Sequence, residues 1–258
     1  MIAAAIEAGQ AAFAIYRGEF AVQTKDDNSP VTAADHAAEA IILARLARDA
    51  AGIPVVAEEQ VAAGRVPAQA ATFFLVDPVD GTKEFVQKSG DFTVNIALVR
   101  EGVPQLGVVY APAKSRLFAG DVSKAAAFRA DQSPLDSKLA VRTAIHTREP
   151  GATGLTVVAS RSHRSPETDT WLAQVKVAEL VSVGSSLKFC LVAAGEADLY
   201  PRLGPTMEWD TAAGHAVLSA AGGEVVHLDG SPFRYGKPDF RNPSFIATGR
   251  RESLPRRH

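Results

Sequence analysis

The stretch that decides the fold runs from an apolar segment into an acidic turn: Thr72-Phe73-Phe74-Leu75-Val76-Asp77-Pro78-Val79-Asp80-Gly81-Thr82. Its first five residues are apolar or β-branched, which predicts a buried strand. Pro78 restricts the backbone and Gly81 frees it, so a tight turn follows. The turn carries two carboxylates, Asp77 and Asp80. Taken alone, it fits an ordinary surface turn as well as a site for magnesium, which prefers oxygen ligands.

Further acids stand at the ends of other predicted elements. Glu58 and Glu59 follow the short apolar run Val55-Val56-Ala57, Asp35 opens a helix, and Asp210 directly precedes one. Strand ends and helix starts are the places where α/β proteins gather functional groups. Each has a plain alternative, because paired acids after a strand are usually solvated and an acid at a helix start is usually a cap.

The sequence of the first half of the chain predicts two helices followed by a sheet. Apolar residues at helical spacing predict a helix from residue 2 to about Gly18, and Thr32 with Asp35 forms a capping signal for a second helix. A surface loop is expected over 60–71. The predicted strands of a mainly antiparallel sheet are 53–57, 72–76, 92–99, 105–110 and 116–119.

The second half alternates between strands and helices, which predicts helices packed on a mixed or parallel sheet. Residues 131–154 are polar and rich in proline and glycine, so we expect an α+β domain over 1–142, with most of the acids, and an α/β domain over 143–258, with Asp210. The predicted strands are 155–159, 177–182, 197–200, 224–227 and 245–248, and the predicted helices are 166–175, 186–194 and 211–221.

Composition excludes several classes of protein. The 258 residues carry 27 basic and 29 acidic side chains, so the net charge of −2 gives no overall attraction to nucleic acid. Cys190 is the only cysteine and is expected in the core, which excludes an intrachain disulfide. No apolar run is long enough to span a membrane. We expect a cytoplasmic protein with a solvated, arginine-rich end.

The acids and their surroundings resemble the inositol monophosphatase superfamily. The resemblance covers nearly the whole chain, and its motifs occur in the order found in that family. They are Asn28-Ser29-Pro30-Val31-Thr32-Ala33-Ala34-Asp35, Val56-Ala57-Glu58-Glu59, Asp77-Pro78-Val79-Asp80-Gly81-Thr82-Lys83-Glu84-Phe85, and Trp209-Asp210-Thr211-Ala212-Ala213 leading to Ala221-Gly222-Gly223.

Within that superfamily, the chain is most similar to the bacterial 3'(2'),5'-bisphosphate nucleotidases. This narrower likeness rests on 92–98, 107–112, Ser160-Arg161-Ser162-His163, Gly184-Ser185-Ser186-Leu187-Lys188-Phe189-Cys190 and Leu199-Tyr200-Pro201-Arg202. The resemblance implies a layered α-β-α-β-α fold.

The resemblance also assigns roles to particular residues. Two or three Mg²⁺ ions would be held by Glu58, Asp77, Asp80, Asp210 and the carbonyl of Val79. Thr82 and Asp35 would activate the attacking water, and Glu59 would support the site or contact a further ion. The scissile phosphate would lie on the amides of Gly81 and Thr82, and the rest of the substrate would meet Arg161, His163, Gly184, Ser185, Lys188 and Arg202.

The implied reaction is hydrolysis of adenosine 3',5'-bisphosphate to AMP and phosphate, with 3'-phosphoadenosine 5'-phosphosulfate as a further substrate. It would belong to sulfate assimilation and be inhibited by lithium. We expect a monomer or a homodimer, and the resemblance allows a peripheral location at the inner face of the cell membrane. One alternative is inositol-1-phosphate or fructose-1,6-bisphosphate as substrate. Another is a non-catalytic regulatory or RNA-associated protein, against which the balanced charge and the complete acid set argue.

Overall fold

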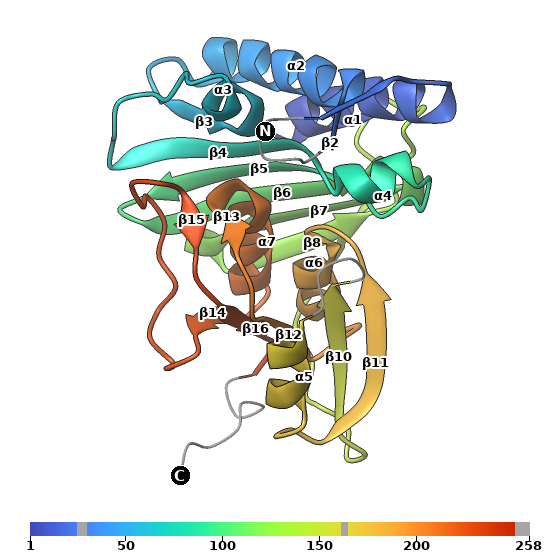
Figure 1. Cartoon of the computed structure of the whole chain (residues 1–258), viewed down its shortest axis with the longest axis vertical. Coiled ribbons are helices and arrows are strands. Elements are labelled where there is room, and N and C mark those ends of the chain that lie inside the picture. Colours follow the sequence, from blue (N-terminus) through green and yellow to red (C-terminus); the bar gives the residue numbers. More distant parts are fainter. Residues whose placement is uncertain (25–29, 161–164, 251–258) are drawn as a thin grey trace.

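The computed structural model describes residues 1–24, 30–160 and 165–250. Its elements stack as five layers in the order helices, sheet, helices, sheet, helix (Figure 1). The layering expected from the resemblance is therefore confirmed.

The helices are α1 (Ile2–Arg17), α2 (Ala33–Asp49), α3 (Glu58–Ala62), α4 (Thr82–Val86), α5 (Pro166–Leu172), α6 (Leu187–Ala193) and α7 (Glu208–Ala220), with 3-10 turns η1 (Pro112–Lys114) and η2 (Val122–Lys124). The strands are β1 (Val22–Thr24), β2 (Pro30–Thr32), β3 (Val55–Ala57), β4 (Thr72–Asp80), β5 (Thr93–Arg100), β6 (Val103–Ala111), β7 (Arg116–Asp121), β8 (Ala126–Ala130), β9 (Arg142–Ala144), β10 (Leu155–Ser160), β11 (Val177–Val183), β12 (Leu199–Arg202), β13 (Thr206–Met207), β14 (Glu224–His227), β15 (Arg241–Asn242) and β16 (Phe245–Thr248).

The outer helical layer forms as the sequence predicts. α1 and α2 cover one face of the first sheet and bury small alanines against each other and against it. At the start of α2, Thr32 and Asp35 form the predicted capping box: the Thr32 hydroxyl accepts from the backbone N–H of Ala34, and the Asp35 carboxylate accepts from the backbone N–H of Thr32. This cap fixes the position of Asp35 at the edge of the sheet.

The first sheet has seven strands in the order β3-β4-β5-β6-β7-β8-β9. Only β3 and β4 run parallel, and the remaining neighbours are antiparallel as predicted. The pairing of β4 with β5 is interrupted between Asp77 and Asp80. Such an irregularity turns side chains away from the regular pleat, so both carboxylates leave the sheet together.

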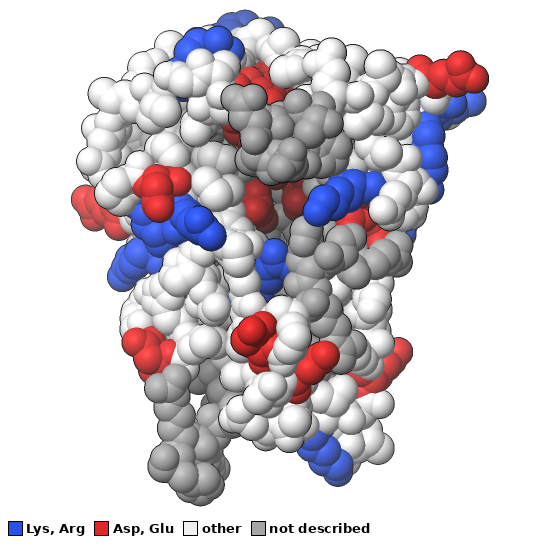
Figure 2. All heavy atoms as spheres, in the orientation of Figure 1, with Lys and Arg blue, Asp and Glu red and all other residues white. Residues whose placement is uncertain are grey.

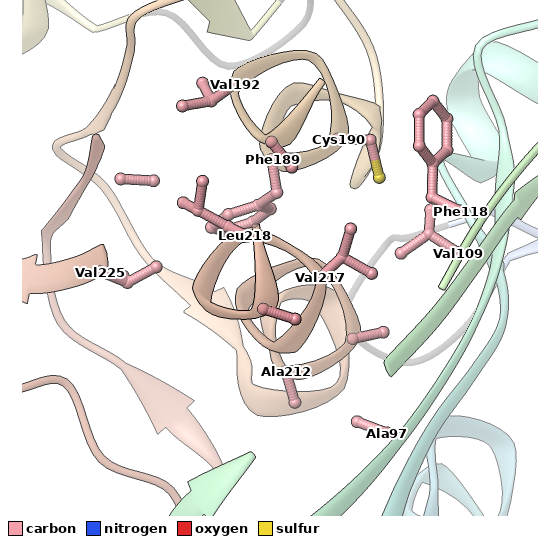
Figure 3. Close-up of a cluster of buried hydrophobic side chains, with 14 of the residues drawn as sticks. Ala97, Val109, Phe118, Phe189, Cys190, Val192, Ala212, Val217, Leu218 and Val225 are labelled. Carbon is pink, nitrogen blue, oxygen red and sulfur yellow. The ribbon is translucent and has the colours of Figure 1, made fainter. Parts of the chain in front are cut away.

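The middle layer consists of α6 and α7, which pack between the two sheets. Figure 3 shows Val217 and Ala212 of α7 near Val109 and Ala97 of the first sheet, with Phe189 of α6 on another side of α7. α7 approaches this sheet closely because β6 and β7 present Gly107 and Gly120 to it. Cys190 lies in the same core and is completely buried, as expected.

The second sheet has the order β11-β10-β12-β16-β14 and is mixed, as expected. β10 runs parallel to β11 and β12, whereas β16 is antiparallel to β12 and β14. α5 packs on its other face through Leu172, with Trp171 beside it. Within the described ranges, no helix is both long and apolar enough to cross a bilayer.

Some predicted boundaries are wrong. Glu58 and Glu59 follow the predicted strand end at Ala57, but they also begin the short helix α3, which continues to Ala62 and so into the predicted loop. α7 begins at Glu208 rather than Thr211, so Asp210 lies in its first turn instead of before it. The polar segment 131–154 contains β9, which extends the first sheet by pairing with β8.

Candidate active site

The end of β4 presents Asp77 and Asp80 to one side of the molecule. Asp77 is 1% exposed, and its Oδ1 accepts a hydrogen bond from the backbone N–H of Val79 at 3.1 Å. Gly81 follows with φ +90°, a conformation in which a side chain would be strained, and its neighbours leave little space for a Cβ atom. The turn chemistry inferred from the sequence therefore holds the two carboxylates in place.

Glu58 and Glu59 reach the same region through the pairing of β3 with β4. Ala57 lies beside Val76, so the residues that follow each strand are neighbours. Glu58 lines the cavity described below, whereas Glu59 is 6% exposed and does not. The backbone N–H of Glu59 donates to Glu39 Oε2 at 2.8 Å. Glu39, a buried acid that the sequence did not single out, thus anchors the start of α3.

Asp35 uses its two carboxylate oxygens differently. Oδ2 accepts from the backbone N–H of Thr32 at 2.8 Å and from its hydroxyl at 2.9 Å. Oδ1 lies 3.4 Å from the hydroxyl of Thr82, which also lies 3.2 Å from the carbonyl oxygen of Val79. Asp35 is therefore a helix cap and at the same time faces the hydroxyl expected to orient water.

Asp210 comes to the acids of the first sheet from the middle layer. Its Oδ2 accepts from the backbone N–H of Met207 at 2.8 Å, which caps α7. Its backbone carbonyl accepts from the hydroxyl of Ser186 at 2.6 Å. The backbone N–H of Ser186 donates to Asp80 Oδ2 at 2.6 Å. Asp80 and Asp210, 130 positions apart, are thus linked through one serine.

Desolvation and mutual repulsion perturb these carboxyl groups. Burial raises the pKa of Asp77 well above its usual value, and the charges of Glu58, Asp80 and Asp210 raise it further. Burial also raises the pKa of Asp210, with Asp80 as the next contributor. The pKa of Asp80 is raised by burial too, although Lys188 opposes that shift. A cation bound among these groups would relieve the repulsion.

Lys188 lines the cavity described below and is only 5% exposed, so it does not lie on an exposed helix face. Its ammonium group donates to the carbonyl of Ser185 and, at 3.5 Å, to that of Val183, and it lies over the ring of Tyr200. Burial lowers the pKa of Lys188 to about 8.

Ser185 itself has φ +52° and a buried hydroxyl oxygen without a partner in the described parts of the chain. Strained backbone of this kind is concentrated at functional sites.

These residues surround a cavity of about 1050 Å³. Figure 2 shows acidic side chains set back in a hollow near the middle of one face, with basic side chains around it. The predicted site residues that line the cavity are Glu58, Asp77, Val79, Asp80, Gly81, Thr82, Ser185, Lys188, Arg202 and Asp210.

The remaining predicted residues lie elsewhere. Asp35 and Glu59 are buried behind the cavity wall. Gly184 packs against Asp91 and Glu84, and its N–H donates to Asp91 Oδ2 at 3.1 Å. Arg161 and His163 lie outside the described residues.

The cavity also contains residues that sequence reasoning missed as site residues, notably Lys83, Tyr200 and Arg241. Lys83 directly follows the acidic turn, and Tyr200 lies two residues from Arg202, so proximity in sequence could have indicated both. Arg241 reaches the cavity because β15 pairs with β13, where Met207 lies opposite it. Nothing in the sequence indicates that pairing.

The donor set fits a hard divalent cation. Its candidate ligands are all oxygen atoms, as magnesium prefers: the carboxylates of Glu58, Asp77, Asp80 and Asp210 and the carbonyl of Val79. In the described part of the chain, no three acidic, histidine or cysteine side chains are grouped closely enough to hold a metal ion by themselves. Magnesium commonly keeps water molecules and substrate phosphate oxygens among its ligands, so protein groups need not fill its coordination shell.

Comparison with known proteins agrees with this geometry. The profile of the Inositol monophosphatase family matches residues 1–256. The chain belongs to the inositol monophosphatase family. The family resemblance inferred from the four acidic motifs is therefore confirmed.

Similar members of this family include proteins named 3'(2'),5'-bisphosphate nucleotidase CysQ. The protein from Shigella flexneri is 46% identical over 241 residues, which cover 92% of this chain and 94% of that protein. The protein from Escherichia coli K12 is 45% identical with the same coverage. Among solved structures, CysQ from Bacteroides thetaiotaomicron has a TM-score of 0.80 and 40% identity and covers 96% of each chain. An inositol monophosphatase from Anabaena has a TM-score of 0.73 and 25% identity, covering 95% of this chain and 87% of that one.

Proposed function

We propose that this protein is a magnesium-dependent 3'(2'),5'-bisphosphate nucleotidase that hydrolyses adenosine 3',5'-bisphosphate to AMP and phosphate. The observation that supports this most is the combination, in one cavity, of an acidic floor with the basic side chains of Lys188 and Arg202. The acids suit cations that bind the scissile phosphate, and the basic groups suit a second phosphate. Relatives with the nucleotidase name that are similar over more than nine-tenths of this chain add further support.

The metal would be held by Glu58, Asp77, Asp80, Asp210 and the carbonyl of Val79. When bound, magnesium would lower the pKa of water and stabilise charge on the phosphoryl oxygens. The Thr82 hydroxyl, facing Asp35, would orient the attacking water and pass its proton towards that carboxylate. The amides of Gly81 and Thr82 would donate to the scissile phosphate. Glu59 would support the start of α3 from behind the cavity wall.

The nucleotide would occupy the other side of the cavity. Arg202 and Lys188 would bind the 5'-phosphate, and Ser185, which lines the cavity, would lie beside the ribose. Gly184, Arg161 and His163 would complete this wall. Because 3'-phosphoadenosine 5'-phosphosulfate also has two anionic groups on one nucleoside, the same site would accept it, and the reaction would serve sulfate assimilation.

The test is phosphate release from adenosine 3',5'-bisphosphate, inositol-1-phosphate and fructose-1,6-bisphosphate, each measured with magnesium and with chelator. We expect magnesium-dependent turnover with the highest kcat/KM for the nucleotide, and loss of turnover in Asp80→Asn. A preference for either other substrate would overturn the nucleotide assignment while keeping the metal site. No turnover of any substrate would overturn the enzyme assignment and favour a regulatory binding protein.

A further inference from the structure

The hydroxyl of Ser186 has a position that helix capping does not explain. Ser186 directly precedes α6, where serine commonly caps the first turn. Here its backbone is helical, with φ −67° and ψ −6°, and its side chain makes no capping hydrogen bond. The side chain is nevertheless 2% exposed, so its hydroxyl must find partners inside the protein.

Those partners come from both sides of the acidic cavity. The Ser186 hydroxyl donates to the backbone carbonyl of Asp210 at 2.6 Å and accepts from Asn95 Nδ2 at 3.0 Å. The Ser186 backbone N–H donates to Asp80 Oδ2 at 2.6 Å. One residue therefore contacts the end of β4 and the first turn of α7, the two segments that carry Asp80 and Asp210.

Asn95 supports the same arrangement from β5. It is fully buried, and its Nδ2 also lies 3.3 Å from Asp80 Oδ2. Because a carboxylate only accepts hydrogen bonds, the amide must turn its NH₂ group towards Asp80. Its Oδ1 is left buried without a partner in the parts of the chain that the structure describes. A buried acceptor without a donor is unfavourable, so the use of this amide lies in the hydrogen bonds that it donates.

The donors all converge on one oxygen of Asp80. Oδ2 receives Ser186 N–H, Asn95 Nδ2 and, at 3.4 Å, the Thr93 hydroxyl, whereas Oδ1 receives no hydrogen bond from the described residues. The carboxylate is thereby fixed about its side-chain torsion, with Oδ1 left to bind a cation. Groups behind a ligand commonly orient it in this way.

We propose that Ser186, supported by Asn95, is a positioning residue that sets the orientation of Asp80 and its spacing from Asp210, so that cation affinity depends on the Ser186 hydroxyl. The inference rests on the metal-dependent function proposed above. It differs from a structural role because the hydroxyl would control cation binding more than stability.

The test measures magnesium binding directly, without substrate, by titration calorimetry on the full chain. We expect Ser186→Ala to raise the magnesium Kd about 10- to 100-fold, the range found when a group behind a metal ligand is removed. The melting temperature in chelator should fall somewhat, because the Asp210 carbonyl and Asn95 lose a buried partner. The change in the magnesium Kd is therefore the readout that decides the inference. Ser165→Ala is the matched control, because the Ser165 side chain does cap its helix, accepting from Thr168 N–H at 3.3 Å. It should lower stability and leave the magnesium Kd unchanged.

Asn95→Ala provides a second, independent arm. Asn95→Ala should raise the magnesium Kd as well. Because Ser186 and Asn95 share a hydrogen bond, the Kd of the double variant should be only slightly higher than that of the single variant with the larger effect. If the fold-change in Kd of the double variant equals the product of the two single fold-changes, the residues act independently and the shared network is contradicted. If Ser186→Ala is unfolded in chelator, Ser186→Cys provides the same comparison, with similar volume and weak hydrogen bonding.

The outcomes separate this inference from the proposed function. If the wild type binds magnesium and the Kd of Ser186→Ala is within twofold of the wild-type value, the positioning role alone is overturned. Wild-type protein that neither binds magnesium nor hydrolyses the bisphosphate overturns both.

Discussion

At the scale of single residues, Asp35 shows that two readings of one acid are compatible. The sequence allowed either a helix cap or a participant in catalysis, and in the structure each carboxylate oxygen has a partner of its own. Oδ2 caps α2 through Thr32, and Oδ1 faces Thr82. Substituting Asp35 would therefore change stability and activity together, so the water-orienting role is better tested at Thr82.

Thr82→Val removes the hydroxyl and keeps the shape of the side chain. We expect kcat for the bisphosphate to fall by about 100-fold or more, the usual size of a general acid–base contribution. The melting temperature should change little, because Thr82 is partly exposed and makes no capping bond. Thr82→Ser, which restores the hydroxyl, should recover most of kcat. A Thr82→Val variant with wild-type kcat would contradict the role of Thr82.

His215 makes stability depend on pH. It is 8% exposed, its Nδ1 lies 3.1 Å from the Tyr235 hydroxyl, and burial lowers its pKa to about 3. The folded protein therefore holds it neutral, whereas the unfolded chain protonates it near pH 6.5. Its contribution to stability is complete above pH 6.5 and falls by about 1.4 kcal/mol for each pH unit below that, until about pH 3.

Urea unfolding at pH 7.5 and pH 5 tests this prediction. His215→Gln should lose less free energy of unfolding between the two pH values than the wild type, by about 2 kcal/mol. His146→Gln is the control, because His146 is exposed and its substitution should leave the difference unchanged. Equal pH dependence in His215→Gln and the wild type would show that His215 is not held neutral.

At the scale of elements, the contact of α7 with the first sheet determines where Asp210 lies. A Cβ atom at Gly107 would lie 2.8 Å from Ala216 Cβ and closer still to the carbonyl oxygen of Ala213, both on α7. Neither can move without shifting the helix. The glycine on β6 thus sets the distance between the helix that carries Asp210 and the sheet that carries Asp77.

Gly107→Ala should displace α7 and so affect both stability and turnover. Overpacking a core typically costs about 1–3 kcal/mol, which for a chain of this size lowers the melting temperature by roughly 2–12 °C. Calorimetry and kcat measured at a temperature where the variant is folded would check both effects. Gly18→Ala, in open surroundings at the end of α1, is the control and should change neither. Full activity in folded Gly107→Ala would show that Asp210 tolerates movement of its helix.

Elements with a clear hydrophobic period could be predicted from the sequence, and those created by tertiary pairing could not. β5 and α2 lie close to their predicted bounds, and the capping box marked the start of α2, whereas β4 continues past its predicted end at Val76 to Asp80. β9 lies in a polar segment with all its residues exposed, so only its pairing with β8 makes it a strand. The five residues of α3 are too few to show a helical period.

At the scale of the whole molecule, the acids and, through the family resemblance, several of the other cavity residues could be predicted, but the contacts that join distant segments could not. Each predicted carboxylate stands beside a local signal, namely a strand end or a helix start. Arg241 and the link from Ser186 to Asp80 depend on contacts between segments far apart in the chain. The resemblance named Lys188 as a substrate contact, but its burial near Asp80 also depends on such long-range contacts.

If the proposed function is right, the arrangement of acids across the molecule should make its stability depend on magnesium. Asp77 and Asp80 come from the first sheet and Asp210 from the middle layer, and burial together with mutual repulsion raises the pKa values of Asp77 and Asp210. A cation shared among them would hold the layers together. At a magnesium concentration about 100 times Kd, binding adds about 2.7 kcal/mol to the free energy of unfolding. This corresponds to a rise of roughly 5–11 °C in the melting temperature.

Asp210→Asn tests whether magnesium stabilises the protein by binding between the layers. The amide oxygen can still accept the capping hydrogen bond from Met207, so the helix start is kept while one charge is removed. In chelator, this variant should melt at the same temperature as the wild type or above it, because the remaining acids repel less. In magnesium its melting temperature should rise much less than that of the wild type, because a ligand is missing. If magnesium raises both melting temperatures equally, the ion does not bind between the layers and the ligand role of Asp210 is wrong.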